Sequence, residues 1–142
     1  MNAAVNVSSA LEAGCVVRGG TPYLSPQGTL YTPGISAQAV GSQALFLGVV
    51  TLQPGARTKA HIHERHESAF YVLSGSDIEL WSGAHLQHRC VAQPGDYLFI
   101  PAGVAHVAVN RGNVPAVFVG ARNEPTASES ASMTPQLDSL VP

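Results

Sequence analysis

The sequence predicts an all-β domain, a sandwich or barrel built from short strands. Apolar runs recur at spacings of roughly 8 to 12 residues, with glycine and proline in the turns between them, which is typical of that fold class. No stretch shows a convincing amphipathic helical period. The chain has 142 residues, of which 45% are hydrophobic. That length is sufficient for one domain with a single buried core.

The first strands are expected after a flexible N-terminal lead at residues 1–14. Residues 15–42 are rich in Gly, Pro, Ser and Thr, so we expect short strands and loops there. Residues 44–52 form an apolar, β-rich run without a helical period. The sequence Gln-Pro-Gly at 53–55 turns the chain at the end of that run.

Later strands are expected wherever an apolar run lies between two turns. One barrel would then span residues 15–122. Residues 123–142 are rich in Ser, Thr, Pro and Glu, and we expect an irregular tail that lies over the barrel or over a partner subunit. The later runs are at 68–73, 77–81, 85–91, 97–100, 105–110 and 116–121.

Charge and composition exclude several classes of function. Only 11% of the residues are charged, the net charge is -2, and no run of Lys or Arg is present, so nucleic acid is not an expected partner. Apolar runs are far shorter than the roughly 20 residues of a membrane-spanning helix. The N-terminus lacks the basic start and apolar region of a signal peptide. We expect Cys15 and Cys90 to be reduced thiols in a cytoplasmic protein.

The region most informative about function is 61–67, which reads H-I-H-E-R-H-E and holds three histidines and two glutamates. Alternate side chains of a strand share a face, so His61 and His63 can converge on one ion. Imidazole suits zinc, copper, iron and nickel, and a carboxylate adds charge and suits manganese. This pattern predicts a metal site.

A second informative stretch is 95–110, which reads G-D-Y-L-F-I-P-A-G-V-A-H-V-A-V-N. Its glycines and its proline suit tight turns, and His106 points to the opposite face from its valine neighbours. The stretch resembles the second motif of the cupin family, and 55–75 resembles the first. The matching positions are Gly95, Pro101, Gly103, His106 and Asn110 in the second motif, and Gly55, His61, His63 and Glu67 in the first.

The resemblance to cupins implies a fold and a cofactor. The fold is a double-stranded β-helix, also called a jelly-roll barrel, in which the two motifs bring His106 to the same ion as His61 and His63. The cofactor is one divalent transition-metal ion, of Fe, Mn, Ni or Zn. A homodimer is also expected, because a small barrel leaves strand edges exposed.

Glu67 is one residue out of register with the closing glycine of the first motif. Counted back from Gly75, the motif's glutamate position holds Ser68. A one-residue offset turns a side chain to the opposite face of a strand, so Glu67 reaches the interior only through a bulge between Glu67 and Phe70. We expect this bulge, which gives a site of three histidines and Glu67. The alternatives are three histidines with water, or His66 as a fourth imidazole.

Three further residues are candidates for handling a substrate. On a regular strand Arg57 and Lys59 share the face of His61, where either can bind a carboxylate or phosphate, although both can also lie in solvent at the barrel mouth. Tyr71 has the parity of Glu67 and is a candidate proton donor, although aromatic residues on such strands also serve as core.

The function expected from these residues is that of a metalloenzyme of small molecules. A dioxygenase or related oxidoreductase would hold its substrate at open metal positions. The alternatives are an isomerase or lyase acting on a sugar-like or hydroxy-carbonyl substrate, and a non-catalytic barrel that binds a metal or a small ligand.

Overall fold

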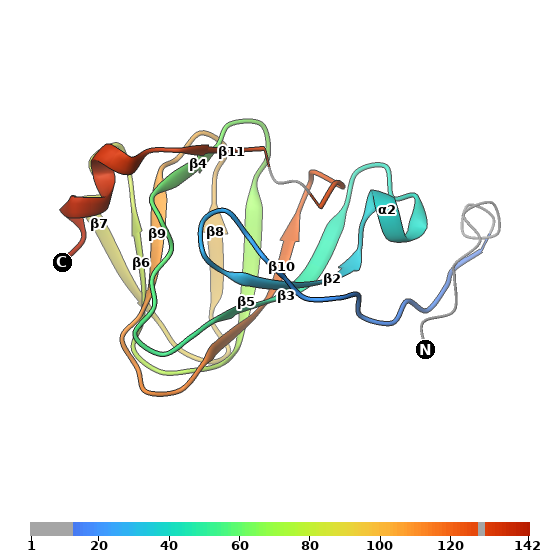
Figure 1. The fold of residues 1–142 in the computed structure, drawn as a ribbon, viewed down its shortest axis with the longest axis horizontal. Coiled ribbons are helices and arrows are strands. Elements are labelled where there is room, and N and C mark those ends of the chain that lie inside the picture. Colours follow the sequence, from blue (N-terminus) through green and yellow to red (C-terminus); the bar gives the residue numbers. More distant parts are fainter. Residues whose placement is uncertain (1–12, 128–129) are drawn as a thin grey trace.

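The computed structural model describes residues 13–127 and 130–142, which form a barrel of two antiparallel sheets (Figure 1). Most of the N-terminal lead predicted at 1–14 lies outside the described residues. The larger sheet has the strand order β1-β2-β3-β10-β5-β8 and the smaller one β11-β4-β9-β6-β7. The predicted all-β jelly-roll fold is confirmed.

The six-stranded sheet is built from strands that lie far apart in the sequence, with β10 between β3 and β5. Its strands are β1 (Tyr23–Leu24), β2 (Leu30–Ile35), β3 (Phe46–Leu52), β5 (Ser68–Ser74), β8 (Tyr97–Ile100) and β10 (Ala116–Arg122).

The five-stranded sheet carries both histidine strands, β4 and β9, side by side. Its strands are β4 (His61–His63), β6 (Ile78–Ser82), β7 (His88–Ala92), β9 (His106–Asn110) and β11 (Ala131–Met133). The described ranges also contain the short helix α2 (Ala37–Val40) and the 3-10 helix η1 (Pro135–Leu140). Within the described ranges, no helix is both long and apolar enough to cross a lipid bilayer.

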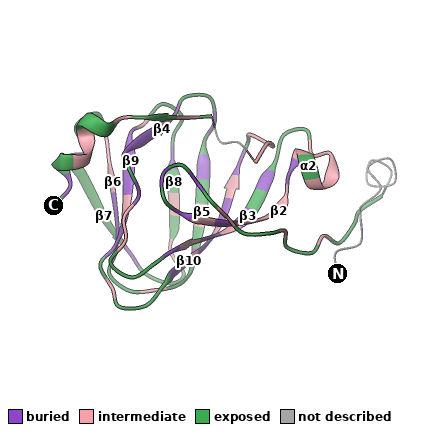
Figure 2. Ribbon diagram, in the orientation of Figure 1, coloured by how far each residue is buried: buried purple, intermediate pink, exposed green. Residues whose placement is uncertain are grey.

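The main core lies between the sheets. Strand β10 shows the reason, because its residues alternate between buried and half-buried (Figure 2), as expected when one face of a sheet is covered. Large apolar side chains of β3, β5, β6 and β10 fill this core, among them Phe46, Val50, Leu52, Val72, Ile78 and Phe118.

A second apolar cluster lies on the other face of the five-stranded sheet, beneath the C-terminal segment. On β9, Val107 and Val109 point away from the main core and pack with Val141 and Leu137. Strand β11 pairs with β4, and the Arg57 guanidinium donates to the carbonyls of Val141 and Asp138, both at 2.8 Å. The segment predicted as an irregular tail therefore contains a paired strand and a short helix, and it covers the strands that carry the histidines.

Two fixed positions of the sequence motifs have structural roles. Asn110 is fully buried, and its Nδ2 donates to the carbonyls of Leu52 at 3.0 Å and Val114 at 2.8 Å. Gly75 has a φ of 128°, and a Cβ there would lie 3.0 Å from the Cα of Ala116. Only glycine fits this turn without strain.

Candidate metal centre

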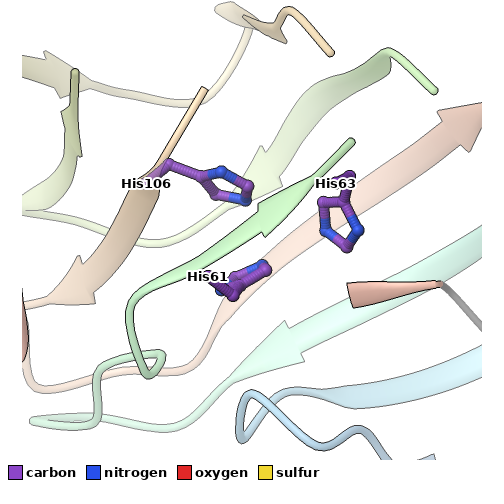
Figure 3. Close-up of side chains that lie close together, drawn as sticks. All are labelled: His61, His63 and His106. Atoms are coloured by element: carbon purple, nitrogen blue, oxygen red, sulfur yellow. The ribbon is translucent and has the colours of Figure 1, made fainter. Parts of the chain in front are cut away.

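Three histidines from two neighbouring strands meet inside the barrel (Figure 3). His61 and His63 lie on β4, and His106 lies on β9 directly opposite His61. All three are buried, and the ligand atoms that they offer lie within 4.8 Å of one another. The ring centroids of His61 and His106 are 4.2 Å apart, and those of His61 and His63 are 4.8 Å apart.

Backbone carbonyls fix the orientation of two of these rings. The Nδ1 of His61 lies 2.6 Å from the carbonyl oxygen of Lys59, and the Nδ1 of His106 lies 3.0 Å from that of Val104. A carbonyl only accepts, so each Nδ1 carries the proton and each Nε2 is left with a free lone pair. This arrangement is typical of histidines that bind a metal.

Burial keeps the imidazoles of His61 and His106 neutral. Together with the neighbouring His61, it lowers the pKa of His106 to about 3, against the opposing hydrogen bond to Val104. Burial also lowers the pKa of His61, despite its hydrogen bond to Lys59. A metal requires the neutral imidazole. The donor set, its orientation and its protonation state therefore fit a divalent transition-metal ion.

The structure places Glu67 outside this group. The predicted bulge is wrong, because β5 pairs without a register shift from Ser68 to Tyr71 with both β8 and β10. Ser68 takes the buried, inward position and Glu67, one residue earlier, is exposed. The backbone N–H of Glu67 donates to Oδ1 of Asn123 at 2.9 Å. The ladder is already regular at Ser68, so no extra residue turns the carboxylate inward.

His66 lies beside the centre and is not one of the three converging histidines. Its side chain is buried, and its ring centroid lies 4.5 Å from that of His63. Its Nδ1 is 3.5 Å from the Ser68 hydroxyl, at the limit of a hydrogen bond. The inward position that the first motif gives to a glutamate is thus held by Ser68, next to His66.

The three candidate substrate residues also lie outside the site. Arg57 binds the C-terminal segment, Lys59 is exposed, and Tyr71 is 37% exposed on the outer face of β5. The prediction for Arg57 and Lys59 assumed a regular strand up to His61. Strand β4 begins only at His61, and Thr58 is the residue that turns inward. Tyr71 points outward for the same reason as Glu67.

The histidines line a pocket inside the barrel that spans about 530 Å³, including open space at its mouth. Sequence reasoning missed its polar residues in the first quarter of the chain, where Thr29 precedes β2 and Tyr31 lies within that strand on the same face. The alternation of these two residues is the sequence feature from which they could have been identified as lining the pocket. The other lining residues are Gln27, Thr58, Val50, Leu52, Phe70, Leu80, Leu98, Ile100, Ala108 and Phe118.

This geometry is that of an ion site with an open side. Three imidazoles approach from the five-stranded sheet, and the side chains across the pocket from them are mostly apolar. Three protein ligands leave coordination positions for water or substrate. Low polarity around those positions strengthens any electrostatic interaction formed there.

Comparisons with known proteins agree with this fold. The tetracenomycin polyketide synthase protein TcmJ of Streptomyces glaucescens is 31% identical over 85 residues, which cover 60% of this chain and 54% of that protein. The chain spans about half the length of the curated relatives it matches.

Two solved structures show the same barrel. A predicted oxalate decarboxylase from Thermotoga maritima has a TM-score of 0.64 and 22% identity, over 78% of this chain and 99% of that one. An oxalate oxidase has a TM-score of 0.64 and 22% identity, over 78% of this chain and 57% of that one.

The family model of the cupin domain matches residues 48–121. This range is just over half of the chain, and it contains the strands that carry all three converging histidines. The chain belongs to the cupin family.

Proposed function

We propose that this protein is a metal-dependent oxidoreductase of a small organic molecule, with one redox-active ion such as Fe, Mn or Ni bound by His61, His63 and His106. The observation that carries the proposal is the convergence of three buried imidazoles, two with lowered pKa values, on one side of a largely apolar pocket. When bound, such an ion supplies Lewis acid or redox chemistry at its open positions.

The remaining lining residues serve to hold and orient the substrate. Phe70, Leu98 and Phe118 keep water from the walls, and the polar groups of Thr29 and Thr58 offer hydrogen bonds at fixed points. The carbonyls of Lys59 and Val104 keep two rings in place, so that the substrate meets a preorganised donor set.

An oxidoreductase is favoured over an isomerase or lyase by the pocket's lining. Proton transfer at carbon requires a positioned acid or base. Among the described residues that line the pocket, no carboxylate or lysine is present, and the titratable groups are the three histidines and Tyr31. The names of the similar proteins, a polyketide synthase protein and two oxalate enzymes, also fit small organic substrates.

The test is metal analysis followed by oxygen-uptake assays. Protein purified without chelators or metal-affinity resin is analysed for bound metal, and the form loaded with that ion is assayed with small organic acids and phenols. The proposal predicts a redox-active ion and oxygen consumption that His106→Ala abolishes and Glu67→Gln retains. Tightly held zinc with product formed in the absence of oxygen would support the isomerase or lyase, and zinc with binding alone would support the non-catalytic barrel.

A homodimer through the outer face of the six-stranded sheet is part of this proposal. Two rows of facing residues cross β3, β10, β5 and β8 there. Tyr97 is 80% exposed and Phe99 is 58% exposed. Monomers rarely expose apolar patches larger than about 300–600 Å², and a second copy would cover this face. The rows are Leu47, Ala121, Ala69 and Phe99, and Val49, Val119, Tyr71 and Tyr97.

A further inference from the structure

A buried arginine ends strand β10 at the edge of the core. Arg122 is only 6% exposed, and its guanidinium carbon lies 3.7 Å from the centroid of the Phe46 ring and 5.9 Å from that of Tyr31. Arginine always carries its charge. A buried charge is costly unless a partner compensates it.

Within the described ranges, this charge contacts aromatic rings and backbone carbonyls, and it donates no recorded hydrogen bond to a carboxylate. Its Nη2 donates to the carbonyls of Thr126 at 2.7 Å and Ala127 at 3.4 Å, and its Nε is buried without a partner. The ion pairs recorded within the described ranges join Arg89 and Arg111 to Glu79 and do not involve Arg122. Glu124, the acid whose pKa responds to Arg122, accepts instead from the N–H and hydroxyl of Thr126.

Arg122 faces a second, smaller pocket that adjoins the histidine pocket. This space of about 180 Å³, which includes open space at its mouth, is lined by Arg122, Ser68, Tyr31 and Phe70 together with two small residues of β10. Tyr31 and Phe70 also line the histidine pocket. Part of this space is open to solvent, so only a small polar group fits beside the guanidinium.

Ser68 connects the arginine with the histidines. It lies opposite Arg122 in the β5–β10 ladder, and its hydroxyl lies 3.5 Å from Nδ1 of His66, whose ring contacts His63. A glutamate at this inward position would place a carboxylate beside the guanidinium. Because this position holds Ser68, β5 supplies no carboxylate opposite Arg122, and there is space in front of the guanidinium.

We propose that the pocket at Arg122 binds the carboxylate of a small organic acid, with the guanidinium as the charged donor and the Ser68 hydroxyl as a second polar contact. Arginine suits carboxylate because its planar fork donates two parallel hydrogen bonds. The acid's other end extends toward the histidine pocket, and its role as a substrate rests on the proposed metalloenzyme function.

Binding of malonate and of its uncharged match malonamide, measured by calorimetry, tests the proposal. Wild-type protein is expected to bind malonate at least tenfold more tightly than malonamide. Arg122→Gln is expected to lose about tenfold in malonate affinity, while Arg122→Lys keeps part of it. Equal binding of the two probes, or full malonate affinity in Arg122→Gln, would overturn the proposal.

Two controls separate this proposal from folding and from the metal. If Arg122→Gln does not fold, the Nε–H signal of Arg122 in wild-type protein, assigned by its absence in Arg122→Lys, is followed by NMR. A shift with malonate and none with malonamide supports the site, and no shift with either overturns it. Malonate binding is measured with and without added metal. If the protein takes up no added metal but still binds malonate selectively, the proposed metalloenzyme function fails and the carboxylate site at Arg122 stands.

Discussion

At the scale of single residues, burial decides what each titratable group can do. His106 is held neutral by burial and by the neighbouring His61, with its pKa near 3. Glu79 is also buried, but its side chain stays charged. Burial alone would raise its pKa, yet hydrogen bonds from Trp81, Arg89 and Arg111 outweigh that effect and lower the pKa to about 2. The neutral imidazole of His106 can therefore bind a metal, whereas the charged carboxylate of Glu79 links neighbouring strands.

Metal-free protein should lose stability on mild acidification because of His106. Its folded pKa of about 3 lies below its ordinary value of 6.5, so the unfolded chain binds more protons between those values and the free energy of unfolding falls as the pH drops. The slope approaches about 1.4 kcal/mol per pH unit for one such histidine. Urea unfolding between about pH 7 and pH 5 measures it. A His106→Gln variant with an unchanged slope would contradict this assignment.

At the scale of elements, charged groups attach the outer segments to the histidine strands. Glu79 on β6 binds Arg89 of β7 at 2.6 Å and Arg111, just after β9, at 2.9 Å. Arg111 also donates to the carbonyl of Pro142 at 2.6 Å. On the same side of the sheet, Arg57 binds two carbonyls of the C-terminal segment. These contacts hold the cover over β4 and β9.

Replacing Glu79 with Gln should destabilise the protein by about 1–3 kcal/mol, since it leaves two arginines without their anion. The loss is moderate because the side chains of Arg89 and Arg111 are 49% and 40% exposed. Chemical denaturation measures the change. Glu64→Gln, at an exposed position, is the matched control and should change stability by less than about 0.5 kcal/mol. Equal effects of the two variants would refute this role of Glu79.

Arg57→Gln should weaken the attachment of the C-terminal segment and leave substrate affinity unchanged. The variant loses hydrogen bonds to Val141 and Asp138, each worth about 1 kcal/mol. Faster amide exchange in η1, followed by mass spectrometry, reports the loosened segment. Lys59→Gln provides an exposed control. If Arg57→Gln instead raises KM and leaves amide exchange in η1 unchanged, Arg57 binds the substrate and not the C-terminal segment.

Spacing alone predicted the strands and the pair His61 and His63 better than it predicted side-chain direction. Glycine and proline punctuate the strands, so β3, β5 and β10 were placed nearly where they lie. The direction of a side chain depends on the residue at which strand pairing begins, and the sequence pattern does not identify that residue. Strand β4 has three residues and β5 pairs from Ser68, and these starting points turned Glu67, Arg57 and Tyr71 away from the pocket. The resemblance to cupins, and not spacing, predicted that His106 meets His61.

At the scale of the whole molecule, the two sheets have different outer faces. The five-stranded sheet is covered by the chain's own C-terminal segment. The six-stranded sheet leaves Tyr97, Phe99 and Leu73 exposed, in a face without charged side chains along its two rows of facing residues. The first face is covered within one chain, and the second is the face through which we propose that two copies pair.

Tyr97→Lys should therefore convert a dimer into a monomer. A buried lysine at this face costs more than the contacts that it replaces, and Tyr97 is exposed enough in one chain for the substitution to leave the fold intact. Sedimentation velocity at micromolar concentration measures the change. Val91→Lys, 59% exposed on β7 of the other sheet, should remain dimeric. A wild-type monomer, or a dimer that survives Tyr97→Lys, would exclude this interface.

The central claim is that three histidines, without Glu67, hold one metal ion. Metal content per chain, measured by mass spectrometry on protein purified without chelators, tests it most directly. The account predicts about one ion in wild-type protein and in Glu67→Gln, and a loss of at least tenfold in the Ala variants of His61, His63 and His106 that retain their fold. Full occupancy in His106→Ala, or loss of the ion in Glu67→Gln, would contradict it.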